Sequence, residues 1–300
     1  MPSQMPNGED VMPTALLDGV QIAYEDVGSG IPIVFCHEFA GSMESWKLQV
    51  NYFSRRYRTI TYNARGYVPS GVPASPEEYS QDHQVETLYQ LLLHLGIDQA
   101  YLCGLSMGAH CVLNFGLAHP EMCRGIIAAG AGTGSANADV MRSESEERAD
   151  KLIAGGMGAQ ENYLTGTTRI RFREKDPTGW AEFARLFLAH SPEGSANTLR
   201  GFQARRPTLY SRADEFAKME VPTLVMVGDE DDPCLEPSLF LKRTIPRAGV
   251  LTLPQTGHAC NLEEPQMFNQ GIAEFLAQVE ANRWGPRPTG SGDSWHVATP

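Results

Sequence analysis

Residues 100–117 read AYLCGLSMGAHCVLNFGL, and this stretch decides how we expect the rest of the chain to fold. A short apolar run over 100–103 is typical of a buried strand, and the segment 109–117 has the composition of a helix. Between them lies Gly104-Leu105-Ser106-Met107-Gly108. A sharp turn from strand to helix crowds its neighbours, and glycines two residues before and after Ser106 relieve that crowding. The pattern therefore predicts a serine presented at the carboxyl edge of a sheet.

Short apolar runs alternate with helical segments along much of the remaining chain. This alternation is typical of the α/β class and predicts a mostly parallel, doubly wound sheet covered by helices. Apolar residues at three- and four-residue steps predict helices over 81–95 and 265–279. The other expected strands are 20–26, 31–36, 57–62, 125–129, 223–227 and 250–253.

The alternation stops between residues 136 and 218, where helical segments follow one another without a convincing buried strand. We therefore expect a helical insertion, or cap, over residues 136–218, and a core domain made of residues 1–135 and 219–283. The last stretch, 284–300, reads WGPRPTGSGDSWHVATP and has no hydrophobic periodicity, which predicts a flexible tail.

Composition excludes several classes of protein. With 36 acidic against 24 basic residues the net charge is −12, which repels nucleic acids and anionic membrane surfaces. No stretch of 18 apolar residues occurs, the first 14 residues have neither the basic nor the apolar region typical of a secretory leader, and the six cysteines have no zinc-site spacing. We expect a cytoplasmic monomer or homodimer with reduced thiols. Because nucleotide-binding glycine motifs and metal-ligand clusters are also missing, no cofactor and no metal are expected.

A serine hydroxyl is a weak nucleophile and needs a base, which in turn needs an orienting group. His258 follows the strand expected at 250–253 and is the predicted base. Asp231 is the predicted orienting acid, chosen from four consecutive acids that follow the strand at 223–227. The backbone N–H groups of Met107 and Phe39 are the candidate donors for an oxyanion. Phe39 belongs to the loop that follows the strand at 31–36.

Taken together, these motifs resemble the α/β-hydrolase superfamily, in its serine-nucleophile branch with a helical cap. The resemblance covers roughly residues 16–279 and includes Asn63-Ala64-Arg65-Gly66-Tyr67, which is similar to the Asp-x-Arg-Gly-x-Gly loop of that family. It implies a catalytic Ser106, Asp231 and His258. The Gly-Leu-Ser-Met-Gly motif is similar to the elbow of 3-oxoadipate enol-lactone hydrolases.

Three positions depart from the family pattern. Glu38 stands where the family has the glycine of a His-Gly pair, which puts a carboxylate beside the predicted oxyanion loop. Asn63 replaces an aspartate, and Ala40 stands where many relatives have proline.

The implied activity is hydrolysis of a carboxylic ester or lactone of a small, partly apolar substrate through an acyl-enzyme. Two alternatives stay open: a carbon–carbon bond hydrolase of aromatic degradation, and a ligand-binding protein on the same scaffold. The expected substrate contacts are His37, Glu38, Trp180, Phe183 and Phe187, although for any single aromatic residue of the cap a place in the cap's own core is favoured. A separate basic series in the cap is interpreted as a solvated face rather than a substrate contact; its members are Arg169, Arg171, Arg173 and Lys175.

Overall fold

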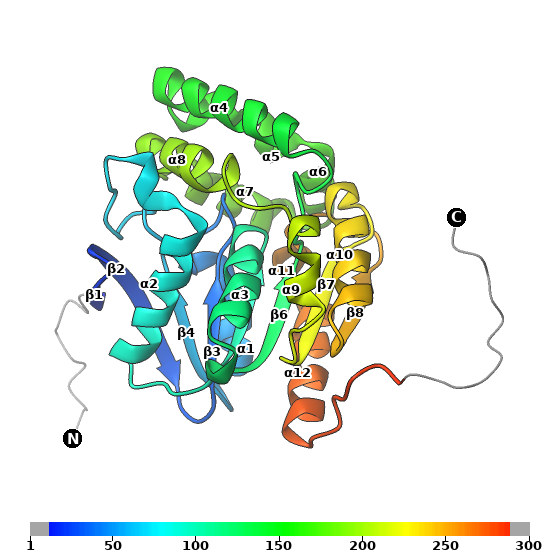
Figure 1. Ribbon diagram of the computed structural model, residues 1–300. Coiled ribbons are helices and arrows are strands. Elements are labelled where there is room, and N and C mark those ends of the chain that lie inside the picture. The colour runs from blue at the N-terminus through cyan, green and yellow to red at the C-terminus, as the bar shows by residue number, and fades with distance from the viewer. Residues whose placement is uncertain (1–11, 289–300) are drawn as a thin grey trace, which may run out of the picture.

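An eight-stranded sheet runs through the centre of the molecule in the order β1-β2-β4-β3-β5-β6-β7-β8 (Figure 1). The structure is a computed structural model that describes residues 12–288. The pairs β1–β2 and β2–β4 are antiparallel, and every other neighbouring pair is parallel. The strands are β1 (Thr14–Leu17), β2 (Val20–Gly28), β3 (Pro32–Cys36), β4 (Arg58–Tyr62), β5 (Ala100–Leu105), β6 (Cys123–Ala129), β7 (Thr223–Gly228) and β8 (Ala248–Leu253).

Helices cover both faces of the sheet, which is why the central strands are apolar along their whole length. Every residue of β5 and β7 is buried. Side chains alternate between the faces, so that Val34 of β3 packs in one apolar cluster while Ile33 and Phe35 pack in the other. The first cluster includes α2 (Gln81–His94), α3 (Met107–Ala118) and α10 (Asp232–Thr244), and the second includes α1 (Lys47–Phe53), α11 (Cys260–Glu263) and α12 (Pro265–Glu280).

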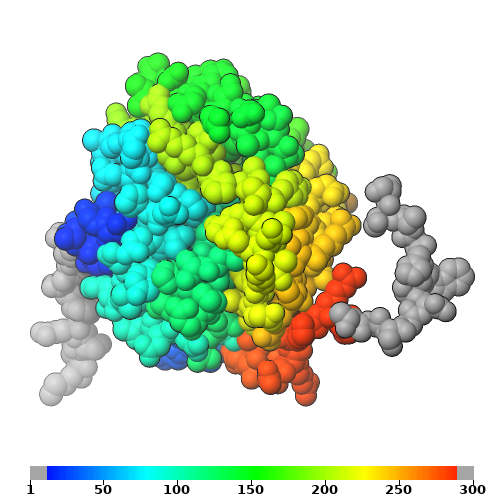
Figure 2. Space-filling model, viewed as in Figure 1, coloured from blue at the N-terminus to red at the C-terminus, as the bar shows by residue number. Residues whose placement is uncertain are grey.

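Residues 136–218 contain helices and turns but no strand, as the sequence predicts. Most of these helices lie together over one end of the sheet, in green and yellow-green (Figures 1 and 2), whereas the last of them, Ala213–Phe216, lies beside α10 and packs in the first apolar cluster. The insertion has its own apolar cluster, built around Leu152, Phe172 and Phe187. Its helices are α4 (Ala138–Gly155), α5 (Glu161–Thr165), α6 (Thr167–Lys175), α7 (Pro177–Leu188), α8 (Pro192–Thr198) and α9 (Ala213–Phe216), with a π-helical turn at Leu199–Gln203.

The structure differs from the sequence prediction at both ends of the sheet. Strand β1 was not expected, because four residues carry too little pattern to be recognised; it pairs with β2 at the edge. Trp284, expected in a flexible tail, instead packs on the domain: its indole N–H donates to the Arg247 carbonyl at 2.8 Å and its ring centroid lies 4.7 Å from that of Phe275. The ordered domain therefore includes Trp284, and residues 289–300 lie outside the described part of the chain.

Two further expectations concern thiols and membranes. All six cysteines are free and buried. Within residues 12–288, no helix has the length and apolar composition that a membrane crossing requires.

The turn at Ser106 joins β5 directly to α3. Ser106 has φ 53° and ψ −107°, a conformation that L-residues rarely adopt. A Cβ atom at Gly104 would collide with the backbone of Gly108, and one at Gly108 would collide with the Cys36 carbonyl at the end of β3. The two glycines therefore let the helix turn back tightly against the sheet, and Ser106 remains partly exposed among buried neighbours.

We predict that Gly108→Ala lowers the free energy of unfolding by roughly 1–3 kcal/mol, because the added methyl group overpacks the contact between α3 and β3. Urea unfolding followed by circular dichroism measures the effect. Gly158→Ala is the matched control, since a Cβ there meets no atom within 4 Å. Equal stability of the two variants would contradict this account of the turn.

Candidate active site

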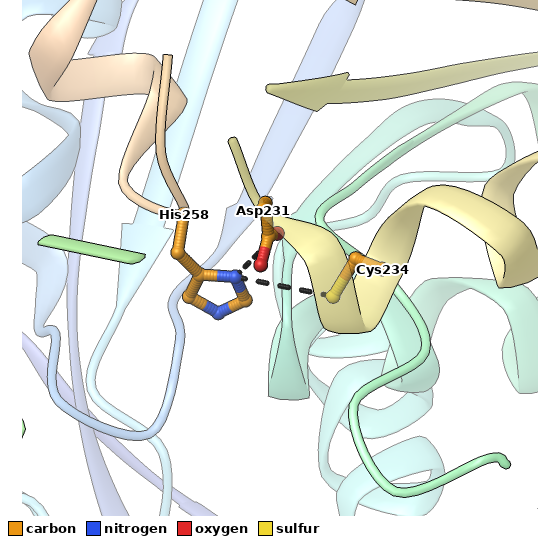
Figure 3. Close-up of side chains that lie close together, drawn as sticks. All are labelled: Asp231, Cys234 and His258. Atoms are coloured by element: carbon orange, nitrogen blue, oxygen red, sulfur yellow. Dashed lines mark hydrogen bonds and ion pairs between the residues drawn. The ribbon is translucent and has the colours of Figure 1, made fainter. Parts of the chain in front are cut away.

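Asp231 and His258 come from neighbouring loops at the carboxyl edge of the sheet. Asp231 follows β7 and His258 follows β8, and the Nδ1 atom of His258 lies 2.7 Å from Oδ2 of Asp231 (Figure 3). Both side chains are buried. Two of the other three acids have separate partners, since Asp229 accepts from the Thr256 N–H and Glu230 pairs with Arg171, and the third, Asp232, is exposed. Of the four consecutive acids, Asp231 is the one that bonds His258.

Backbone contacts hold the His258 loop against the insertion. The His258 N–H donates to the Thr168 carbonyl of α6 at 2.8 Å. The preceding residue must be glycine, because a Cβ at Gly257 would collide with that same carbonyl. The Gly257 N–H donates to a Glu263 carboxylate oxygen at 2.9 Å. The histidine is thereby fixed from both the core domain and the insertion.

The charge of Asp231 controls the protonation of His258. Burial alone lowers the pKa of His258, but the charge of Asp231 and its hydrogen bond raise that pKa by more, and the pKa lies well above the ordinary value of a histidine. The Nδ1 proton therefore stays on the ring and faces Asp231.

Ser106 and His258 line the same cavity, whose volume is about 320 Å³. The backbone N–H groups of Met107 and Phe39 donate no hydrogen bond to any other described residue. Met107 is the first residue of α3, so its N–H also lies at the positive end of the helix dipole. The Phe39 carbonyl accepts from the Tyr67 hydroxyl, which fixes the loop that carries the second N–H.

Glu38 and Arg169 form a buried ion pair beside this cavity. Each residue is 1% exposed, and both guanidinium NH groups approach the Glu38 carboxylate. Arg169 also donates to the Tyr163 hydroxyl at 2.6 Å. Its guanidinium carbon lies 4.5 Å from the Tyr163 ring centroid and 5.0 Å from that of Phe183, within cation–π range. Arg169 therefore does not belong to a solvated face, and this sequence-based interpretation was wrong for that residue.

The cavity wall is mixed, with apolar surface beside many polar side chains. The insertion contributes most of it, through side chains that the sequence analysis did not single out: Glu144, Ser145, Arg148, Asn162, Tyr163, Thr167, Thr168 and Gln203. The apolar side chains on the wall are Phe39, Met141, Leu199 and Pro233. The wall is therefore partly apolar, but its apolar surface comes from other residues than the cap aromatics expected from the sequence.

The expected aromatic contacts do not reach this wall. Phe183 and Phe187 are buried in the insertion's own core, and Trp180 is half-buried against it, with its indole N–H donating to the Leu164 carbonyl. The sequence could not distinguish these cases. An aromatic residue that faces the core and one that faces a cavity both lie on the apolar face of a helix and have the same spacing.

His37 and Glu38 lie behind the cavity wall and do not line it. The Nδ1 atom of His37 bonds the Glu38 carbonyl at 2.7 Å, and its Nε2 accepts from the Ala64 N–H at 3.0 Å. Burial lowers the pKa of His37 to about 4, so the ring is neutral and supports the loop. Neither residue is placed as a direct substrate contact.

Among residues 12–288, one group of three side chains has metal-ligating types close enough to share an ion: Asp231, Cys234 and His258, all buried (Figure 3). The Cys234 thiol lies 4.0 Å from His258 Nδ1 and 3.2 Å from the Gly130 carbonyl. Two of the three members already bond each other, so an ion would have to replace the bond between Asp231 and His258.

Comparison with known proteins identifies the family to which this fold belongs. The sequence profile of the alpha/beta hydrolase fold family matches residues 31–265. The chain belongs to the α/β-hydrolase fold family. The resemblance drawn from the serine turn and its partner loops is thereby confirmed at the level of the family and its fold.

Individual relatives are distant. The chain is 25% identical to 3-oxoadipate enol-lactonase 2 of Acinetobacter baylyi, over 81% of this chain and 88% of that protein. It is 25% identical to a thermophilic esterase from Thermogutta terrifontis, with a TM-score of 0.80 over 90% of this chain and 99% of that one. An enol-lactonase from Burkholderia xenovorans shares the fold, with a TM-score of 0.79, 23% identity, and coverage of 88% of this chain and all 100% of that one.

We predict that Asp231→Asn lowers the pKa of His258, since burial then acts without the opposing charge of Asp231. In the unmodified protein the ring stays protonated as the pH rises past the ordinary histidine value of about 6.5, and in the variant it loses its proton at lower pH. A pH titration of the histidine ring signals by NMR measures this. Asp229→Asn is the control, because Asp229 bonds Thr256 rather than His258. An unchanged His258 titration in Asp231→Asn would contradict the assignment.

Proposed function

We propose that this α/β hydrolase cleaves a carboxylic ester or lactone through an acyl-enzyme on Ser106. The observation that carries the proposal is the buried bond between Asp231 and His258 at the wall of the cavity that Ser106 also lines. The matching similarity to an enol-lactonase and an esterase supports the same class of reaction.

In the first half of the reaction, the Ser106 hydroxyl oxygen attacks the substrate carbonyl carbon while His258 Nε2 takes the hydroxyl proton. Asp231 holds the other ring nitrogen and stabilises the imidazolium that forms. The carbonyl oxygen becomes an oxyanion and receives hydrogen bonds from the Met107 and Phe39 N–H groups. His258 then gives its proton to the leaving alkoxide as the carbon–oxygen bond breaks.

In the second half, water takes the place of the alcohol. His258 removes a proton from the water, the hydroxide oxygen bonds to the acyl carbon, and the proton passes to Ser106 as the acyl–serine bond breaks. The products are a carboxylic acid and an alcohol, or a hydroxy acid or its keto tautomer from a lactone. The His258 ring must be neutral at the start of each half, so the rate rises with pH through its raised pKa.

The cavity favours a compact substrate that carries polar as well as apolar groups. A long alkyl chain entering a volume of about 320 Å³ would have to strip water from Arg148, Asn162 and other polar groups without replacing their hydrogen bonds. A short acyl group, or one with its own hydroxyl, amide or carboxylate groups, avoids that loss.

We predict that Ser106→Ala leaves the circular dichroism spectrum unchanged and lowers kcat/KM for p-nitrophenyl acetate by roughly 10⁶-fold, as for removal of the nucleophile in other serine hydrolases. Labelling by a fluorophosphonate is lost together with turnover. Ser145→Ala, which alters another serine of the same cavity, keeps the label. Full activity of Ser106→Ala would exclude the mechanism, and labelled Ser106 without ester turnover would favour carbon–carbon bond cleavage instead.

We also predict that kcat/KM falls along the p-nitrophenyl ester series from acetate and butyrate to decanoate, because the cavity is small and polar side chains interrupt its apolar surface. Steady-state kinetics below the micelle-forming concentration of each ester give the comparison. A rate that increases with chain length would show that the site accommodates a long alkyl chain and would contradict this assignment.

A further inference from the structure

We propose that Glu38 is a positioning residue for His258, and that Arg169 from the insertion keeps the Glu38 carboxylate from opposing the oxyanion. In this arrangement His258 lies between two carboxylates, one at each ring nitrogen. The inference rests on the proposed function, because it assigns roles within the same catalytic cycle.

The placement of the two carboxylates is the first observation. Asp231 Oδ2 lies 2.7 Å from Nδ1, and Glu38 Oε2 lies 4.0 Å from Nε2. The Nε2 atom is the one that takes the Ser106 proton in the proposed reaction. When it does so, the new positive charge forms next to Glu38, in a site that water does not screen. Glu38 therefore stabilises the imidazolium from the side that Asp231 does not reach.

The loop after β3 holds Glu38 at this point. The Glu38 carbonyl accepts from the Gly41 N–H at 3.1 Å and bonds the neutral His37 ring. A side chain at position 41 would crowd Glu38, because a Cβ on Gly41 would lie 3.1 Å from the Glu38 Cγ. The same turn carries Phe39, so a carboxylate and a proposed oxyanion donor sit on adjacent residues.

That adjacency creates an electrostatic conflict. An unpaired carboxylate beside Phe39 would repel the negative oxygen of the tetrahedral intermediate. Arg169 resolves it by pairing with Glu38 and by stacking between the Tyr163 and Phe183 rings. Burial alone raises the pKa of Glu38, but the Arg169 and His258 charges outweigh burial and hold that pKa below its ordinary value. The pair therefore stays ionised while its charges largely cancel at the oxyanion.

The groups that face His258 come from four parts of the fold. Asp231 precedes α10 and Cys234 lies in its first turn, while Glu38 comes from the loop after β3. Arg169 of α6 and Tyr163 of α5 stand behind Glu38. Burial raises the pKa of Cys234, so its thiol is neutral over the working range and adds no charge. Substitution of Glu38 or Arg169 therefore changes the charge near His258 while Asp231 stays in place.

Removing these two charges shifts the His258 titration in opposite directions. Glu38→Gln removes a negative charge near Nε2, and the rate then rises at lower pH than in the unmodified enzyme. Arg169→Met leaves Glu38 uncompensated, which moves the rise to higher pH and lowers the plateau rate. A residue with a purely structural role would change stability or the plateau without moving the pH of the rise.

The experiment is the pH profile of kcat/KM for p-nitrophenyl acetate in the unmodified enzyme and four variants. The acidic limb is expected to move down by about one pH unit in Glu38→Gln, a tenfold change in the protonation ratio. It is expected to move up in Arg169→Met, with a plateau lower by on the order of 10²-fold, the scale of a lost oxyanion donor. The double variant should lie between the two single variants.

Arg171→Met is the matched control, because Arg171 is two residues away on the same helix and pairs with Glu230 at the surface. Its profile should match that of the unmodified enzyme. The proposal is overturned if Glu38→Gln leaves the limb in place or if both single variants move it in the same direction.

Two safeguards separate the possible failures. Loss of one partner of a buried ion pair is strongly destabilising, so the thermal stability of each variant is measured before its kinetics. If Arg169→Met does not fold, Glu38→Gln is the deciding variant, because its amide oxygen still accepts a hydrogen bond from Arg169. If the unmodified protein neither hydrolyses esters nor reacts with a fluorophosphonate, the proposed function fails. An NMR titration of His258 in Glu38→Gln then still decides whether Glu38 acts on the ring.

Discussion

The structure depends above all on the close approach of α3 to the sheet at Ser106. Gly108 lies against the Cys36 carbonyl of β3, and Gly104 lies against the backbone of Gly108. These contacts leave no space for side chains and hold Ser106 at a φ of 53°. The cost of that backbone conformation is offset by the buried strands and helices on either side, which fix the turn from both ends. The position of Ser106 is therefore set by the steric contact between α3 and the sheet.

The insertion takes part in the site as well as covering it. Its α6 helix accepts a hydrogen bond from the His258 backbone through the Thr168 carbonyl, and one residue later supplies Arg169 to Glu38. A change in the position of α6 would therefore alter the histidine loop and the charge balance of the oxyanion loop together. In the proposed mechanism, α6 therefore links the cavity wall to the groups that set the protonation of His258.

Much of the fold could be predicted because parallel strands buried on both faces leave continuous apolar runs, as at β3, β5 and β7. The pairing of Asp231 with His258 could also be predicted, since loops after neighbouring strands meet at one edge. The burial of Arg169 could not be predicted, because Arg171 and Arg173 on the same helix have the same side chain and similar sequence surroundings. Only the three-dimensional position of Glu38 shows which of them is buried, and sequence periodicity does not reveal a contact across 131 residues.

The most direct measurement of the central claim is the location of the covalent intermediate. The protein would be mixed with p-nitrophenyl acetate, quenched in acid within milliseconds to seconds, digested and analysed by mass spectrometry. Our account predicts an acetyl group on the peptide that contains Ser106 and its appearance at the rate of nitrophenol release. Turnover with no acetylated peptide, or with the acetyl group on another residue, would contradict it.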